Sequence, residues 1–124
     1  MNRKIYIVDD EPSFTRIVKA NLEKTGGYSV LTQNDPLQAI PEVIEFKPDM
    51  VFLDVMMPGM EGGELAALIR EEPGMADTPI VFMTAIVTKQ ETGQGMGEIG
   101  GNLFLAKPVK LQEMLDTIES ILDK

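Results

Sequence analysis

Short apolar runs alternate along the chain with longer stretches in which apolar residues recur every three or four positions. The runs at 5–8, 50–53, 80–83 and 103–106 are apolar at every position, a pattern typical of strands that are buried on both faces of a sheet. Residues 28–33 alternate more clearly between apolar and polar, as edge strands do. The pattern therefore predicts five strands.

Four other stretches have the period of an amphipathic helix. Their apolar faces comprise Phe14, Ile17, Val18 and Leu22 in the first; Leu37, Ile40, Val43 and Ile44 in the second; Leu65, Leu68 and Ile69 in the third; and Leu111, Met114, Leu115, Ile118, Ile121 and Leu122 in the last. Asp35 and Pro36 fit the cap and the first position of the second helix. Pro41 lies inside that helix and has no backbone N–H, so it should kink the helix or make it restart.

The stretch between the fourth and fifth strands has an ambiguous pattern. Residues 88–91 read as a capping box, which predicts that a helix begins there. Five glycines follow within 93–101, and each glycine inside a helix costs about 0.5–1 kcal/mol relative to alanine. We expect a fourth helix that is short, orders late or is mobile.

Strands and helices therefore alternate, in an α/β chain that forms one domain over residues 1–124. Strands buried on both faces require helices on both sides of a parallel sheet. Right-handed crossovers leave few topologies. One is a doubly wound, five-stranded parallel sheet of flavodoxin-like order 2-1-3-4-5.

The composition excludes several kinds of chemistry. The chain has neither cysteine nor histidine, so disulfides, thiolate or imidazole metal ligands and nucleophiles activated by histidine are excluded. Its net charge of −9 repels nucleic acids and anionic membranes, so we expect no direct binding to either. The sequence has no membrane-spanning run and no recognisable leader. A cytoplasmic location is the simple interpretation.

Polar residues follow four of the predicted strands. They are the pair Asp9 and Asp10, then Asp54, Thr84 and Lys107. In an open parallel sheet, the carboxyl ends of the strands meet at one edge and form the ligand site. Carboxylates about 4 Å apart repel by roughly 4 kcal/mol per pair at an effective dielectric of 20. A hard divalent cation such as Mg²⁺ would relieve this repulsion.

With these motifs in this order, the whole chain resembles the receiver domains of two-component response regulators, which are CheY-like. The resemblance rests on the acidic pair, on Asp54 in residues 53–60, on Thr84 before Ala85, and on Lys107 before Pro108. It implies that Asp54 accepts a phosphoryl group from a phosphohistidine. The donor would be a sensor histidine kinase or a histidine phosphotransfer protein.

The resemblance also implies roles for the neighbouring residues. Asp10, Asp54 and the backbone carbonyl of Met56 would bind Mg²⁺, with Asp9 contributing directly or through water. Thr84 and Lys107 would contact the phosphoryl group, and the Lys107–Pro108 peptide would be cis. The domain would then be a signalling phosphoacceptor rather than an enzyme, catalysing only its own phosphorylation and dephosphorylation.

Phosphorylation of Asp54 would switch a protein-binding surface through Thr84 and Phe104. Many relatives have tyrosine where Phe104 stands, so here packing alone would report the switch. The downstream target would be another protein, and a homodimer that forms on phosphorylation fits the same class. We also expect slow dephosphorylation, because Met56 and Ile86 would shield the phosphoryl group from water.

Other functions remain open from the residues alone. A phosphatase of the haloacid dehalogenase type needs a second Asp two residues after its nucleophile, where Met56 stands. A flavodoxin-like cofactor carrier needs a phosphate-binding loop after the first strand, where Asp9 and Asp10 would repel the phosphate. A receiver fold that acts as a scaffold without phosphorylation is the third alternative. The pattern is equally compatible with a complete chain and with the N-terminal part of a longer regulator.

Overall fold

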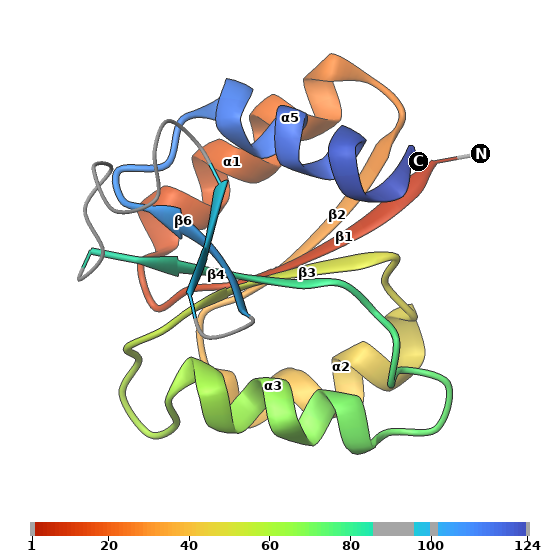
Figure 1. The fold of residues 1–124 in the computed structure, drawn as a ribbon, viewed down its shortest axis with the longest axis vertical. Coiled ribbons are helices and arrows are strands. Elements are labelled where there is room, and N and C mark those ends of the chain that lie inside the picture. The colour runs from red at the N-terminus through yellow and green to blue at the C-terminus, as the bar shows by residue number, and fades with distance from the viewer. Residues whose placement is uncertain (1, 86–95, 100–101, 124) are drawn as a thin grey trace.

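The computed structural model describes residues 2–85, 96–99 and 102–123. One twisted sheet with the strand order β2-β1-β3-β4-β6-β5 runs through the middle of the molecule. In Figure 1, α1 and α5 lie on one face of this sheet, and α2 and α3 lie on the other. The predicted five parallel strands, their order and the helices on both faces are confirmed.

The bounds of the elements agree closely with the apolar pattern. The parallel strands are β1 (Arg3–Val8), β2 (Tyr28–Gln33), β3 (Met50–Asp54), β4 (Ile80–Thr84) and β6 (Asn102–Ala106). The helices are α1 (Pro12–Thr25), the short 3-10 helix η1 (Pro36–Gln38), α2 (Ala39–Phe46), α3 (Gly62–Glu71) and α5 (Leu111–Leu122). None of the helices in the described part of the chain combines the length and the apolar character that a bilayer crossing needs.

A sixth strand, β5 (Met96–Ile99), extends the sheet beyond the predicted five. It pairs antiparallel with β6, with Ile99 opposite Asn102 and Met96 opposite Leu105. The prediction of a fourth helix in this stretch is therefore wrong for residues 96–99. Glycine-rich sequence disfavours a helix, and pairing with a neighbouring strand supplies the backbone hydrogen bonds instead. The predicted start of that helix at Thr88 lies outside the described residues.

Two apolar clusters fill the space between the sheet and its helices. On the α2–α3 side, Tyr6, Val51 and Leu53 pack with residues of those helices. On the α1–α5 side, Ile5, Ile7 and Phe52 pack with Val18, Leu22, Met114 and Ile118. Alternate residues of β1 thus enter opposite clusters, as a strand buried on both faces requires. The central strands are held firmly, which fixes where their carboxyl ends lie.

The second helical segment restarts, which was one of the two outcomes expected for Pro41. Asp35 caps η1, its side chain accepting a hydrogen bond from the Leu37 backbone N–H at 3.0 Å. The α-helix proper begins at Ala39, so Pro41 lies in its first turn, where a missing N–H costs no hydrogen bond. Leu37 and Ile44, which were expected on the buried face of this helix, have exposed side chains.

Candidate functional site

The predicted polar residues converge at the carboxyl edge of the sheet. Asp9 directly follows β1, Asp54 and Thr84 end β3 and β4, and Lys107 directly follows β6. Asp54, Thr84 and Lys107 border a cavity of about 380 Å³. Its lining consists of Asp10, Glu11, Asp54, Met56, Thr84, Ala85 and Lys107. The prediction that these polar residues meet at one edge of the sheet is confirmed by their positions at the strand ends.

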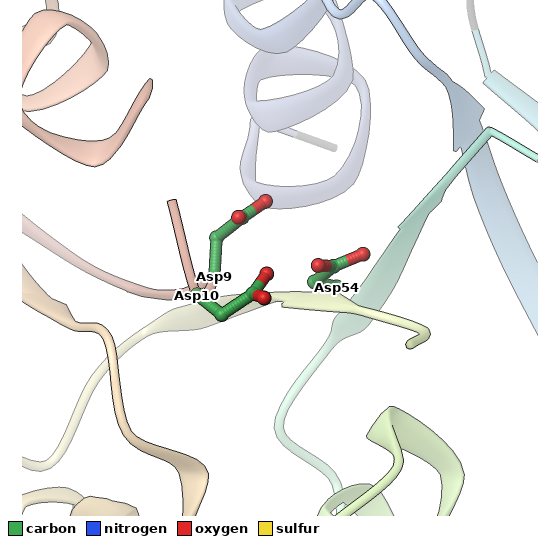
Figure 2. A group of neighbouring side chains, drawn as sticks. All are labelled: Asp9, Asp10 and Asp54. Carbon is green, nitrogen blue, oxygen red and sulfur yellow. The ribbon is translucent and has the colours of Figure 1, made fainter. Parts of the chain in front are cut away.

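Three carboxylates form the acidic half of this site. One oxygen from each of Asp9, Asp10 and Asp54 lies within 4.8 Å of the others. Figure 2 shows the three side chains gathered above the ends of their strands. Asp9 and Asp54 are buried, whereas Asp10 is half-buried and reaches the cavity. Like charges this close and this poorly hydrated repel one another strongly.

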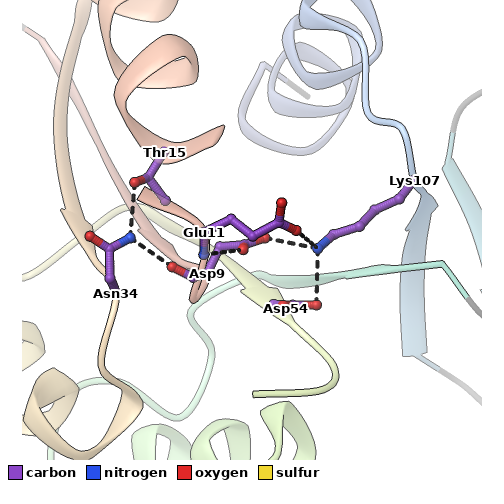
Figure 3. Close-up of polar contacts among 6 residues, drawn as sticks. All are labelled: Asp9, Glu11, Thr15, Asn34, Asp54 and Lys107. Carbon is purple, nitrogen blue, oxygen red and sulfur yellow. Dashed lines mark hydrogen bonds and ion pairs between the residues drawn. The ribbon is translucent and has the colours of Figure 1, made fainter. Parts of the chain in front are cut away.

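Lys107 supplies the positive charge that faces them. Its Nζ lies 3.0 Å from Asp9 Oδ2, 3.3 Å from Asp54 Oδ1 and 3.7 Å from Glu11 Oε1 (Figure 3). The Lys107–Pro108 peptide is cis, as expected. The Lys107 backbone N–H donates to the Thr84 carbonyl at 2.9 Å. This hydrogen bond ties the two strand ends together.

The balance of burial and charge shifts three pKa values. Burial, followed by the negative charge of Asp9, raises the pKa of Asp54 to about 6 against the attraction of Lys107. Burial also raises the pKa of Asp9, although the Glu11 backbone N–H and Lys107 oppose the shift. Burial alone would lower the pKa of Lys107, but Asp9 and Asp54 outweigh it and raise that pKa. Lys107 therefore stays charged. Its single positive charge does not balance the negative charge of the three neighbouring carboxylates.

Asp9 carries the clearest sign that a cation fits here. Its Oδ1 accepts a hydrogen bond from the Glu11 backbone N–H at 3.0 Å. Its Oδ2 is fully buried and accepts no hydrogen bond from the described residues, although the Lys107 ammonium lies 3.0 Å away as an ion-pair partner. Buried acceptors normally find a partner. An oxygen-only ligand set with one unsatisfied carboxylate oxygen suits a hard cation such as Mg²⁺.

Met56 and Gly62 shape the loop that follows Asp54. Met56 lines the cavity with a side chain that is 63% exposed. The Gly62 N–H donates to the Val55 carbonyl at 2.8 Å, and a Cβ at Gly62 would lie 2.3 Å from the Asp54 carbonyl oxygen. Only glycine allows this close approach. The neighbouring glycines Gly62 and Gly63 are the sequence signal that could have indicated this close contact.

Phe104 lies behind the site rather than in it. Its ring packs against Phe82, with centroids 5.4 Å apart and the planes inclined by 31°. The two residues are register partners on β4 and β6. Phe82 is two residues from Thr84 along β4. Phe104 is therefore connected to the cavity by packing through a neighbouring strand. Ile86, the second residue expected to shield the phosphoryl group, lies outside the described residues.

The chain is similar in sequence to known proteins over nearly its whole length. Residues 5–119 match the sequence profile of the response regulator receiver domain. The chain is 34% identical over 122 residues to the alkaline phosphatase synthesis transcriptional regulatory protein PhoP of Bacillus subtilis, covering 98% of this chain and 49% of that protein. It is 37% identical over 123 residues to the transcriptional regulatory protein YvrH of the same organism, covering 99% of this chain and 50% of that protein. The chain thus spans about half the length of these curated relatives.

Solved structures show the same fold. The chemotaxis response regulator CheY4 of Vibrio cholerae superposes with a TM-score of 0.80 at 28% identity, over 97% of this chain and 98% of that one. A putative response regulator from Chloroflexus aurantiacus gives a TM-score of 0.82 at 28% identity, over the full length of both chains.

Proposed function

Since the chain belongs to the response regulator receiver domain family, we propose that it accepts a phosphoryl group from a phosphohistidine onto Asp54. The observation that carries the proposal is the contact between Lys107 and two carboxylates, Asp9 and Asp54, at the mouth of a cavity. A buried carboxylate held beside a cation and open to a cavity is suited to attack phosphorus.

The positions of the side chains support the following chemistry. An Asp54 carboxylate oxygen attacks the phosphorus, an O–P bond forms, and the P–N bond to the donor imidazole breaks with its electron pair leaving on nitrogen. The Lys107 ammonium lies on the same side and would stabilise negative charge on the phosphoryl oxygens. Thr84 borders the same cavity, so its hydroxyl is suited to donate to another of these oxygens. In hydrolysis, water attacks the phosphorus, the O–P bond to Asp54 breaks, and the carboxylate is regenerated as inorganic phosphate is released.

Asp9, Asp10, Asp54 and the Met56 carbonyl are the ligands we propose for Mg²⁺. Bound there, the cation would neutralise charge on the phosphoryl oxygens during transfer. The acidic cluster and the unsatisfied Asp9 oxygen support the assignment.

The phosphorylated state would act through packing. Thr84 would move toward the phosphoryl group, and the space behind it would let Phe104 change its contact with Phe82. The downstream partner would be a protein that reads this face, and a homodimer formed on phosphorylation is one such readout. The donor would be a sensor histidine kinase or a histidine phosphotransfer protein. We expect the transfer to occur in the cytoplasm, where ATP phosphorylates such kinases.

Incubation with acetyl phosphate and MgCl₂, followed by intact mass measurement, tests the proposal. We expect a gain of one phosphoryl group that hydroxylamine removes, because an acyl phosphate reacts with this nucleophile. Asp54→Asn should abolish the gain. Asp77→Asn, an exposed residue in the loop after α3, is the matched control and should leave it unchanged. Failure of the wild-type protein to gain mass while a known receiver does so would overturn the proposal.

A further inference from the structure

The end of β2 holds the acidic turn after β1 through an amide side chain. Asn34 Nδ2 donates to the Asp9 backbone carbonyl at 2.8 Å and to Thr15 Oγ1 at 3.0 Å (Figure 3). The Asp9 backbone N–H in turn donates to the Gln33 carbonyl at 3.1 Å. Both backbone groups of Asp9 are therefore fixed, one by Gln33 at the end of β2 and the other by Asn34, the residue that follows it.

These hydrogen bonds set the orientation of the Asp9 and Asp10 carboxylates. Because the Asp9 carbonyl belongs to the peptide that joins Asp9 to Asp10, its hydrogen bond to Asn34 fixes the plane of that peptide. The plane decides where the Asp10 side chain points. Thr15 donates to the Pro12 carbonyl at 3.2 Å, so the same amide also ties the turn to the first turn of α1.

Asn34 is itself held in place. Its backbone N–H donates to the side-chain oxygen of Gln33 at 3.1 Å, and the Gln33 side-chain amide donates to Glu42 Oε1 at 2.8 Å. The Tyr6 hydroxyl, fully buried in β1, donates to the same Glu42 oxygen at 2.8 Å. A continuous set of hydrogen bonds thus runs from α2 through the end of β2 to the Asp9 carbonyl. Chains of this kind restrict side chains more than isolated hydrogen bonds do.

We propose that Asn34 is a positioning residue for the cation site: its amide orients the Asp9–Asp10 peptide so that the acidic side chains are preorganised to bind Mg²⁺. The proposal rests on the proposed function, since it concerns the same site. Asn34 touches neither the cavity around Asp54 nor any of the three carboxylates through its side chain. Groups that orient metal ligands in this way typically change metal affinity by about 10–100-fold when removed.

The test is a titration with MgCl₂, followed by calorimetry or by amide chemical shifts, on the folded full chain. Asn34→Ala removes both hydrogen bonds and should weaken Mg²⁺ binding about tenfold, the lower end of that range. Thr15→Val removes the Asn34–Thr15 and Thr15–Pro12 hydrogen bonds, keeps the Asn34–Asp9 bond, and should weaken binding less. Gln38→Ala is the matched control: it removes the hydrogen bond from Gln38, the last residue of η1, to Asp35 and should leave Mg²⁺ affinity unchanged.

A second readout separates positioning from general loosening of the structure. At saturating MgCl₂, Asn34→Ala should take up phosphoryl groups from acetyl phosphate at close to the wild-type rate, with only the Mg²⁺ concentration for half-maximal rate increased. Equal Mg²⁺ affinity in wild type and Asn34→Ala would overturn the inference while leaving the proposed function intact. A reduced rate at saturation would also overturn it. If wild type binds no Mg²⁺, the proposed function fails first.

Discussion

Lys107 Nζ lies 3.3 Å from Asp54 Oδ1, across the cavity at the carboxyl edge of the sheet. The same ammonium lies 3.0 Å from Asp9 Oδ2. One cation is thus shared between two buried carboxylates whose pKa values are both raised by burial. The charge of Lys107 therefore contributes to the stability of the fold as well as to the proposed chemistry.

Replacing Lys107 with methionine should destabilise the Mg²⁺-free protein. The variant keeps most of the side-chain volume but leaves Asp9 and Asp54 without their cation, and removing one partner of a buried ion pair costs about 3–5 kcal/mol. We expect about 2–3 kcal/mol, because the Lys107 side chain keeps 19% of its surface exposed and solvent screens the loss. Urea unfolding in EDTA measures the difference.

Addition of MgCl₂ should recover much of the stability lost in Lys107→Met, because a divalent cation can take over the neutralising role. Lys24→Met, on the exposed end of α1, provides the control and should show no such recovery. Equal stability of Lys107→Met and wild type in EDTA would contradict the assignment of a stabilising charge to Lys107.

The raised pKa of Asp54 predicts how stability depends on pH in the absence of Mg²⁺. The folded-state pKa of about 6 exceeds the unfolded value of about 4, so the folded protein binds this proton more tightly. The contribution of this proton to the stability of the folded state is fully present below pH 4 and is lost as the pH rises through 6. Two pKa units correspond to on the order of 3 kcal/mol. The raised pKa of Asp9 acts in the same direction.

Asp54→Asn should therefore stabilise the Mg²⁺-free protein at pH 8, by about 1–2 kcal/mol, and should flatten the pH dependence between pH 5 and pH 8. The gain is smaller than the full linkage because Lys107 loses one of its two close partners. Urea unfolding of both proteins at the two pH values provides the measurement. A variant less stable than wild type at pH 8 would show that the pair with Lys107 outweighs the cost of burying the charge.

The positions of Asp54 and Lys107 could be predicted because they depend only on the strands. Four continuous apolar runs fix the sheet, and the residues at the ends of parallel strands must meet at one edge. The contact of Asn34 with the Asp9 carbonyl could not be predicted, because it depends on the register that pairs Val8 with Gln33. An amide at the end of an edge strand carries no signal until that register is known.

The two wrong predictions, a helix at residues 96–99 and a buried Leu37, have a similar physical origin. Residues 96–99 form a strand because they pair with β6, and antiparallel pairing at an edge leaves little trace in four residues. Leu37 is exposed because the helical segment divides at Ala39, and the periodicity of one continuous helix no longer applies across the break. Local pattern predicts an element well when the element is long, and poorly where neighbouring backbone decides its conformation.

Phosphorylation should change the surroundings of Phe104. The Phe104 ring contacts Phe82, two residues before Thr84, so movement of Thr84 toward a phosphoryl group alters the space around both rings. Fluorine NMR on protein labelled at its 5 phenylalanines should show a shifted Phe104 signal after addition of acetyl phosphate and MgCl₂. The signal of Phe46, at the end of α2, should stay where it is.

Thr84→Ala should separate this switch from the chemistry. We expect the variant to acquire the phosphoryl group on Asp54, since the nucleophile and Lys107 are intact, and to lose the shift of Phe104. An unchanged Phe104 signal in fully phosphorylated wild type would contradict packing as the route to the output surface.

Met56 should control how long the phosphoryl group lasts. Its side chain borders the cavity beside Asp54, where an apolar group hinders the approach of the water that hydrolyses an acyl phosphate. Met56→Asn replaces it with a polar group that can hold water. We expect hydrolysis about fivefold faster, equivalent to about 1 kcal/mol of barrier. Loss of the phosphorylated mass over time in MgCl₂ measures the rate.

Leu37→Asn is the matched control, because Leu37 is 62% exposed against 63% for Met56 but does not line the cavity. It should hydrolyse at the wild-type rate. Equal acceleration in both variants would indicate a general effect of surface polarity, and an unchanged rate in Met56→Asn would indicate that water reaches the phosphorus from another side. A wild-type half-life of seconds in MgCl₂ would contradict shielding altogether.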